Sequence, residues 1–217
     1  IFLIISFISK AGTPTIIFKE NKGQWPEKVL FGAEFYNVKF YVNESSFNYC
    51  IYNPEDLARL GIKNNEQKHT VHGHNYEVNF IGADFQNSIK SEQQREKYNY
   101  FLGSDRSKWA SKVKAFGNLE FKNIYDNIDL KLYSNGLDLK YDFIIRKGAD
   151  VNSIRINFNH IDGIELINNE IVIKTSVVNI IEKEPYAYQI INGKQKKIKC
   201  NYVLSGNSSV GFVFPEG

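Results

Sequence analysis

Residues 128–143 read IDLKLYSNGLDLKYDF, and apolar and polar side chains alternate on both sides of the Asn135-Gly136 pair. Alternation with a period of two places successive side chains on opposite faces of a strand, and an Asn-Gly pair readily takes the positive φ angles of a type I′ turn. The stretch therefore predicts a β-hairpin with one buried face. The side chains expected in the core are Leu130, Leu132, Leu139, Tyr141 and Phe143.

The polar side chains of this hairpin are expected to face water and to pair across the two strands. They are Asp129, Lys131, Asp138, Lys140 and Asp142. Turn chemistry accounts for Asp126, which comes just before the first strand. Because paired carboxylates can hydrolyse glycosidic bonds, these acids are also the candidates for a hydrolase site. We prefer the interpretation that they are solvated or paired with lysines.

The hairpin pattern recurs along the chain. Downstream, alternating segments 164–166 and 171–173 flank Asn168-Asn169, and segments 186–191 and 198–204 flank Asn192-Gly193. In the N-terminal half, strands are expected over 39–42, 47–52 and 72–81, one or two helical turns over 54–60 and a polar loop or excursion over 82–95. Short strands joined by tight turns, without intervening helices, indicate antiparallel sheets.

The expected fold is therefore all-β, an antiparallel β-sandwich-like structure of two packed β subdomains with one or two short helical turns. The chain has 217 residues, of which 42% are hydrophobic and 14% aromatic, so a substantial core is available. We place an N-terminal β subdomain over residues 12–95 and a C-terminal hairpin-rich subdomain over 96–217, with Trp109, Phe116 and Phe121 packing the connection. One continuous sandwich is the alternative.

The first residues differ from the rest of the chain. Residues 1–11 read IFLIISFISKA, an apolar run followed by small residues at the −3 and −1 positions of a signal-peptidase site. The run is shorter than the roughly 20 residues of a membrane span. We interpret it as the remnant of a signal peptide, which predicts a secreted or cell-surface protein that does not span the membrane after cleavage. A buried first strand is the alternative.

Cys50 and Cys200 are the two cysteines of the chain. So few cysteines make no disulfide framework, even in an exported protein. Cys200 shares its alternation phase with Tyr202 and is expected to point inward, whereas Cys50 shares a phase with Asn48. Two unpaired thiols are expected, and one bridge is the alternative.

Charge and motifs argue against several functional classes. The net charge is +3, with 27 basic and 24 acidic residues, so the chain has no strong electrostatic footprint for nucleic acid. It contains no GxSxG, HExxH, P-loop or GxGxxG motif. We expect no nucleic-acid partner, no cofactor and no catalytic residue.

His69, His72 and His74 form the most suggestive cluster of metal-ligating residues. Two histidines at i and i+2 share one face of a strand, and imidazoles so placed can bind one metal ion. No acidic residue or cysteine lies at an obvious ligand spacing from them. We prefer an exposed polar strand edge without a bound metal.

An ordered set of motifs is spread over nearly the whole chain. The segments are 18–26 (FKENKGQWP), 29–31 (VLF), 99–103 (NYFLG) with Trp109, 124–130 (IYDNIDL), 139–143 (LKYDF), 148–150 (GAD) and 184–189 (EPYAYQ). Together they resemble an uncharacterised N-terminal domain of secreted, Bacteroidetes-type surface proteins. In such proteins the domain precedes SBBP (β-propeller) repeats and PKD or other Ig-like modules.

The resemblance implies a secreted or surface-anchored location, often with a type IX sorting domain, and an association with adhesion or gliding motility. It supplies no catalytic residues. Fold maintenance explains the motif positions, because Gly23 suits a turn, Trp25 seals the core, and buried tyrosines direct their hydroxyls to backbone partners. The motif positions are Asn21, Gly23, Gln24, Trp25, Tyr125, Asp129, Tyr141, Pro185, Tyr188 and Gln189.

The expected function is that of a non-catalytic structural or interaction module of an exported cell-surface protein, related to adhesion or gliding motility. Its partners would be other domains of the same protein, or a glycan or protein ligand. The aromatic content of an exported β domain makes a carbohydrate-binding module the alternative. A glycoside hydrolase-like enzyme ranks behind both.

Overall fold

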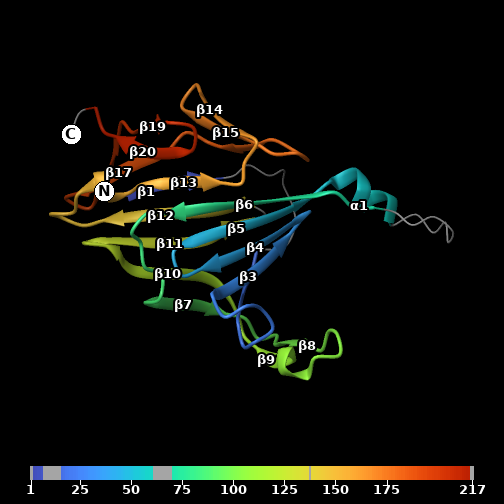
Figure 1. Ribbon diagram of the computed structural model, residues 1–217. Helices are drawn as coiled ribbons and strands as arrows, with labels where there is room; N and C mark the ends of the chain where they lie inside the picture. Colours follow the sequence, from blue (N-terminus) through green and yellow to red (C-terminus); the bar gives the residue numbers. More distant parts are fainter. Residues whose placement is uncertain (1, 7–15, 61–69, 137, 216–217) are drawn as a thin grey trace.

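The computed structural model describes residues 2–6, 16–60, 70–136 and 138–215, and of residues 2–6 it gives the backbone course. The fold is all-β and sandwich-like, which confirms the prediction from the alternating segments (Figure 1). Helix α1 (Pro54–Leu60) occupies the stretch where helical turns were expected. Within the described ranges, no helix is both long and apolar enough to cross a membrane.

The largest sheet has 15 strands, and its neighbouring strands run antiparallel. Its order is β18-β17-β1-β12-β11-β10-β2-β3-β4-β5-β6-β13-β20-β19, and β7 pairs with β10. The strands are β1 (Phe2–Ser6), β2 (Phe18–Glu20), β3 (Val29–Phe35), β4 (Val38–Asn43), β5 (Ser46–Tyr52), β6 (Gly73–Phe80), β7 (Ser88–Gln93), β10 (Ala115–Tyr125), β11 (Ile128–Asn135), β12 (Asp138–Ile145), β13 (Ile156–Asn159), β17 (Tyr186–Ile191), β18 (Lys194–Ile198), β19 (Asn201–Ser205) and β20 (Ser209–Val213).

Two small sheets complete the fold. One contains β14 (Gly163–Ile167), β15 (Glu170–Lys174) and β16 (Ile180–Glu182), and the other contains β8 (Tyr98–Tyr100) and β9 (Ala110–Val113). Short 3₁₀ helices η1 (Arg106–Lys108) and η2 (Val151–Ser153) lie in the connections. Ile171 and Ile173 of β15 are fully buried in the main core, so the three-stranded sheet covers part of the large one.

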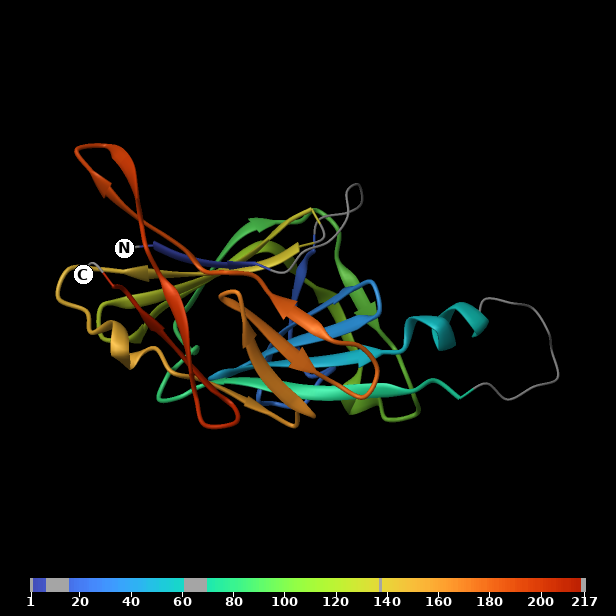
Figure 2. The same cartoon turned by 90° about the horizontal axis from the view of Figure 1, so that it is seen from above.

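The large sheet folds back on itself (Figure 2). Buried aromatic side chains fill the space between its layers. Tyr141 of β12 contacts Phe47 of β5 with ring centroids 5.8 Å apart, and Phe143 of β12 contacts Phe80 of β6 at 6.1 Å. All four rings are fully buried. Such edge-to-face pairs add about 0.5–1.5 kcal/mol each to the hydrophobic gain from burial.

The central hairpin is confirmed, with its turn displaced by one residue. β11 pairs with β12 from Ile128↔Ile145 to Asn135↔Asp138, and the five side chains predicted for the core are buried. Of the Asn-Gly pair only Gly136 has a positive φ, 66°. The loop therefore begins at Gly136, and Asn135 belongs to the strand ladder. This changes each cross-strand partner by two positions, an even number, so the buried face is preserved.

The two downstream turns agree more closely with the prediction. Asn168 and Asn169 have φ values of 51° and 62° between β14 and β15, and Asn192 and Gly193 have 51° and 74° between β17 and β18. Both residues of each pair thus have the positive φ of a type I′ turn. Asparagine and glycine tolerate this conformation with the least strain.

The polar stretch 82–95 was predicted to be a loop, and this was wrong for its second half. Ser88–Gln93 forms β7, which pairs with β10. Nearly all of its residues are exposed, including Ile89 at 49%. An edge strand whose side chains stay in water has no alternation of apolar and polar residues, so its sequence does not reveal it as a strand. β7 is held by its backbone hydrogen bonds to β10.

Two other expectations concern the chain's organisation. Strands from both sides of the predicted boundary at residues 95–96 share one sheet, since β7 pairs with β10 and β6 pairs with β13. Phe2–Ser6, within the predicted leader, forms strand β1 between β12 and β17, so this segment is a strand, as the alternative interpretation proposed. Cleavage of this segment stays a prediction. Cys50 is half-buried and Cys200 is buried, and both are free thiols.

Asp129 contradicts the expectation that the hairpin's polar side chains face water. Its side chain is fully buried, accepts a hydrogen bond from the Asn123 N–H at 2.9 Å, and pairs with Lys122 (3.0 Å) and Arg146. Burial by itself raises the pKa of Asp129, but the Asn123 N–H and the two cations more than compensate, so the pKa lies below its usual value. Pairing with three donors makes an inward-facing carboxylate stable here.

We predict that Asp129→Ala lowers the free energy of unfolding by about 3 kcal/mol, because it leaves Lys122, Arg146 and the Asn123 N–H without their shared acceptor. Urea unfolding at pH 7 measures the effect. Since the pKa of Asp129 is lowered by folding, its contribution is present at neutral pH and disappears as the pH falls through the folded-state pKa. Asp126→Ala is the control: Asp126 is exposed, and a change below about 0.5 kcal/mol is expected. Equal losses in both variants would contradict the assignment.

Candidate functional site

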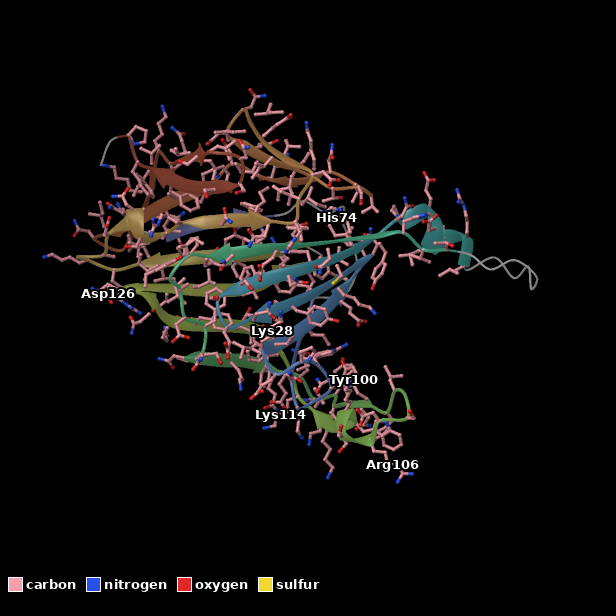
Figure 3. All side chains as sticks on the ribbon, viewed as in Figure 1. Lys28, His74, Tyr100, Arg106, Lys114 and Asp126 are labelled. Atoms are coloured by element: carbon pink, nitrogen blue, oxygen red, sulfur yellow. The ribbon has the colours of Figure 1, made fainter. Side chains whose placement is uncertain are left out.

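A small hairpin projects from the side of the sandwich and carries apolar side chains into solvent. We call residues 98–113, with β8, η1 and β9, the side hairpin; Figure 3 labels its Tyr100 and Arg106. Phe101, Leu102 and Trp109 are 57%, 79% and 37% exposed. Contiguous exposed apolar side chains of this kind commonly mark interaction sites.

The exposed side chains of the side hairpin hold one another in place. The rings of Phe101 and Trp109 meet edge to face with centroids 5.6 Å apart, and the Arg106 guanidinium lies 5.4 Å from the centre of the Trp109 ring. The indole N–H of Trp109 donates to the Gly103 carbonyl at 3.2 Å. Trp109 was expected to pack a connection between subdomains; it lies at the surface instead, whereas Phe116 and Phe121 are in the core.

The loop at residues 21–25 fixes the base of the side hairpin. The Trp25 ring contacts Tyr100 at 5.5 Å and Tyr41 at 5.6 Å, both edge to face. The Lys22 ammonium donates to the Ser111 carbonyl at 3.0 Å. The motif segments 18–26 and 99–109, far apart in sequence, are therefore in contact in the fold.

Asn21 organises this loop through both ends of its amide. Its Oδ1 accepts from the N–H groups of Gly23 (3.0 Å) and Trp25 (3.2 Å), and its Nδ2 donates to the carbonyls of Trp25, Pro26 and Val29. Gly23 has a φ of 104°, which a residue with a side chain rarely adopts. The Gln24 side chain adds a bond to the Glu20 carbonyl at 2.7 Å. These contacts stiffen the loop that carries Trp25.

Gly32 of β3 provides the space in which the Trp25 ring lies. A Cβ atom built on Gly32 would come within 2.7 Å of the Trp25 ring carbon Cη2. The close approach needs a residue without a side chain, so Gly32 and Trp25 form one packing unit. The sequence gives no signal for this pair, because Gly32 lies inside a strand, one residue past the motif segment 29–31.

A second unusual feature is a buried carboxyl group, Glu182, between the sheets. It is 1% exposed, and its Oε2 accepts from the Tyr141 hydroxyl at 3.3 Å. Burial raises the pKa of Glu182 to about 7, although the Tyr141 hydrogen bond opposes this. Tyr141 was expected to reach a backbone partner, and it reaches this carboxyl instead. The sequence does not reveal Glu182 as a buried residue, because β16 reads Ile-Ile-Glu and has no alternation of apolar and polar residues.

A largely apolar cavity of about 420 Å³ lies beside this cluster. Tyr49 and Tyr76, stacked 4.8 Å apart, form part of its lining together with Val38, Leu139 and Ile180. Asp138 also lines the cavity, but Glu182 does not.

The four acids weighed as hydrolase candidates have different surroundings. Asp126 is exposed on the turn before β11, at the end of the sandwich labelled in Figure 3, and Asp129 is in its ion network. Asp142 accepts from the Tyr133 hydroxyl at 3.2 Å, and burial raises its pKa to about 6. Asp138 lines the apolar cavity beside Tyr49 and Tyr76. The acids are not drawn into one pocket.

The histidines of the predicted cluster have separate partners. The ring Nδ1 of His72 lies 2.7 Å from a carboxylate oxygen of Asp56. His74 places Nδ1 at 2.9 Å from the Ser176 hydroxyl and Nε2 at 2.7 Å from the His160 carbonyl. His69 lies outside the described residues. In the portions of the chain that the structure covers, no three His, Cys, Asp or Glu side chains form a metal-binding group.

The remaining motif residues lie on the body of the sandwich. Tyr125 ends β10 with its ring packed against the core, while Tyr188 and Gln189 lie on β17, which Pro185 precedes. A family model described as a domain of unknown function (DUF7948) matches residues 18–217. No curated protein and no solved structure matches the chain. The matched range begins at the first residue of the motif 18–26 and includes both the side hairpin and Glu182.

We predict that Gly32→Ala displaces Trp25, destabilises the fold by about 1–3 kcal/mol, and loosens the side hairpin, because the core cannot take up an overpacked Cβ without movement. Trypsin cleavage after Arg106 or Lys108 should become faster than in the parent protein. Gly211→Ala is the matched control, since its Cβ would meet nothing closer than 3.9 Å. Unchanged cleavage in the Gly32→Ala protein would show that Trp25 does not hold the hairpin.

We predict a pH-dependent stability gain from Glu182→Gln. A carboxyl whose pKa is raised by folding destabilises the native state progressively between its ordinary value of 4.5 and about 7. The glutamine variant should therefore match the parent protein near pH 4.5 and exceed it at pH 8 by on the order of 3 kcal/mol. Thermal unfolding across this range checks the difference. Glu44→Gln, at an exposed position, should show no such trend.

Proposed function

We propose, from the premise that the chain belongs to the DUF7948 family, that it is a non-catalytic interaction module of an exported cell-surface protein and that the side hairpin is its binding site. The observation that carries the proposal is the exposed group of Phe101, Leu102 and Trp109 on a hairpin whose base is held by Trp25. A rigid apolar group binds with little loss of side-chain entropy, because it is ordered before the partner arrives.

Export is proposed from the sequence. The apolar run at residues 1–8 and the small residues before position 12 support a signal peptide. The motifs that resemble Bacteroidetes-type surface proteins support the context of SBBP repeats, Ig-like modules and type IX sorting. In that context the module would take part in adhesion or gliding motility, with other surface domains or external ligands as partners.

A protein partner suits the side hairpin better than a sugar. Sugar binding by stacking needs an open aromatic face, but the Arg106 guanidinium lies over the Trp109 ring. Leu102, the most exposed of the three apolar side chains, offers aliphatic surface instead. Aromatic and arginine side chains are also the residues enriched in the energetically dominant parts of protein interfaces.

We predict that a photoreactive benzophenone amino acid at position 102 forms a discrete covalent adduct with a protein at the surface of intact cells. Adding Phe101→Ala and Trp109→Ala should reduce the adduct at least tenfold while the domain stays folded, because both side chains lie outside the hydrophobic core. The same probe at Leu166, an exposed strand residue elsewhere, is the control. Absence of an adduct would contradict the protein-binding role. Binding to a glycan array that depends on Trp109 would favour the carbohydrate-binding alternative.

A further inference from the structure

Strand β1 occupies a position between two strands that no other part of the sheet joins. Its residues Phe2–Ser6 pair antiparallel with Ile144–Lys140 of β12, and Phe2–Ile4 pair antiparallel with Tyr188–Tyr186 of β17. In the strand order, β17 and β18 connect to the rest of the large sheet through β1. Without β1, β12 and β17 would each present an unpaired row of backbone groups.

The strands on both sides of β1 carry sequence motifs that the proposed function does not use. Residues 139–143 form most of β12, and residues 186–189 form most of β17. Both segments belong to the ordered motif set of the sequence. Two distant motif segments therefore enclose the same strand position.

The geometry of this position defines what it accepts. Opposed residues of antiparallel strands share a face, so positions opposite Tyr141 and Phe143 face the core, where both rings are fully buried. The position of β1 that pairs with Phe143 of β12 also pairs with Ala187 of β17, and Ala187 is fully buried too. Its small side chain leaves room for a large apolar one from the strand between. Positions opposite Asp142 and Lys140 face outward and suit polar residues.

We infer that, once the leader has been removed, β12 and β17 form a slot that accepts an extended segment of another polypeptide, antiparallel to both strands and apolar at alternate positions. The inference rests on the export step of the proposed function, which removes residues 1–11. Strand addition satisfies the exposed backbone groups along the ladder, and the alternate side chains supply selectivity. β1 itself, seated in the slot, shows the length and direction of strand that fits.

The test uses the exported protein, purified from the cell surface, with its N-terminus determined by mass spectrometry. The probe is a fluorescein-labelled peptide that carries the sequence of residues 2–6 between pairs of lysines, and its binding is followed by fluorescence anisotropy. Saturable binding is expected. A peptide with proline in place of Ile4 should bind at least tenfold more weakly, because Ile4 is paired on both sides and proline removes its N–H from the ladder.

Ala187→Leu fills the apolar room of the slot and should also weaken binding of the probe peptide at least tenfold. Val203→Ala, at an exposed position on β19, is the control and should bind like the parent protein. Circular dichroism of each variant verifies folding, and the proline peptide tests the slot in the unaltered protein if Ala187→Leu does not fold.

Two results would overturn the slot. One is an exported protein that retains residues 1–11, since its own strand then fills the position. The other is a cleaved protein that does not bind the peptide, or binds the proline peptide equally well. The second result leaves the side hairpin's role intact, because the photocrosslinking at position 102 measures that role separately.

Discussion

The ring of Tyr141 holds the two layers of the sandwich together, and the rest of the fold depends on this contact. It packs edge to face against Phe47 and Phe80 of the opposite layer, with centroids 5.8 and 6.0 Å away. Its hydroxyl bonds to Glu182, which links the small three-stranded sheet to the same place. Because aromatic side chains fill the interior to this extent, the surfaces available to partners are those at the sides and edges of the sheet.

The side hairpin and the strand slot both follow from how the sheet ends. A sheet folded over an aromatic core leaves edges that must be covered, charged or paired. The exposed strand β7 covers one stretch of β10, and the three-stranded sheet covers another part of the core. β12 pairs with β1, which is formed by residues 2–6, so removal of the proposed signal peptide would leave this edge of β12 unpaired.

Sequence reasoning predicted the elements whose side chains alternate. The hairpin at β11 and β12 and the Asn-Asn turn could be read because burial on one face determines residue type. β7 could not be read, because its residues lie in water on both faces. Asp129 was assigned to the wrong environment because alternation at the start of β11 is broken: Ile128, Asp129 and Leu130 are all buried. The buried carboxylate of Asp129 is stabilised by partners that only the fold brings close, such as Arg146.

The candidate site was predictable in its parts and not in its assembly. The motif segments that contain Trp25 and Tyr100 were identified from the sequence, but their contact depends on Gly32, which no motif contains. A hairpin that served only the fold would be expected to bury its apolar side chains against the core. This one instead keeps Phe101 and Leu102 in water while Asn21 and Trp25 stiffen its base. Contacts at the base of the hairpin therefore hold an exposed apolar surface in one arrangement. This is the pattern expected of a preorganised binding site.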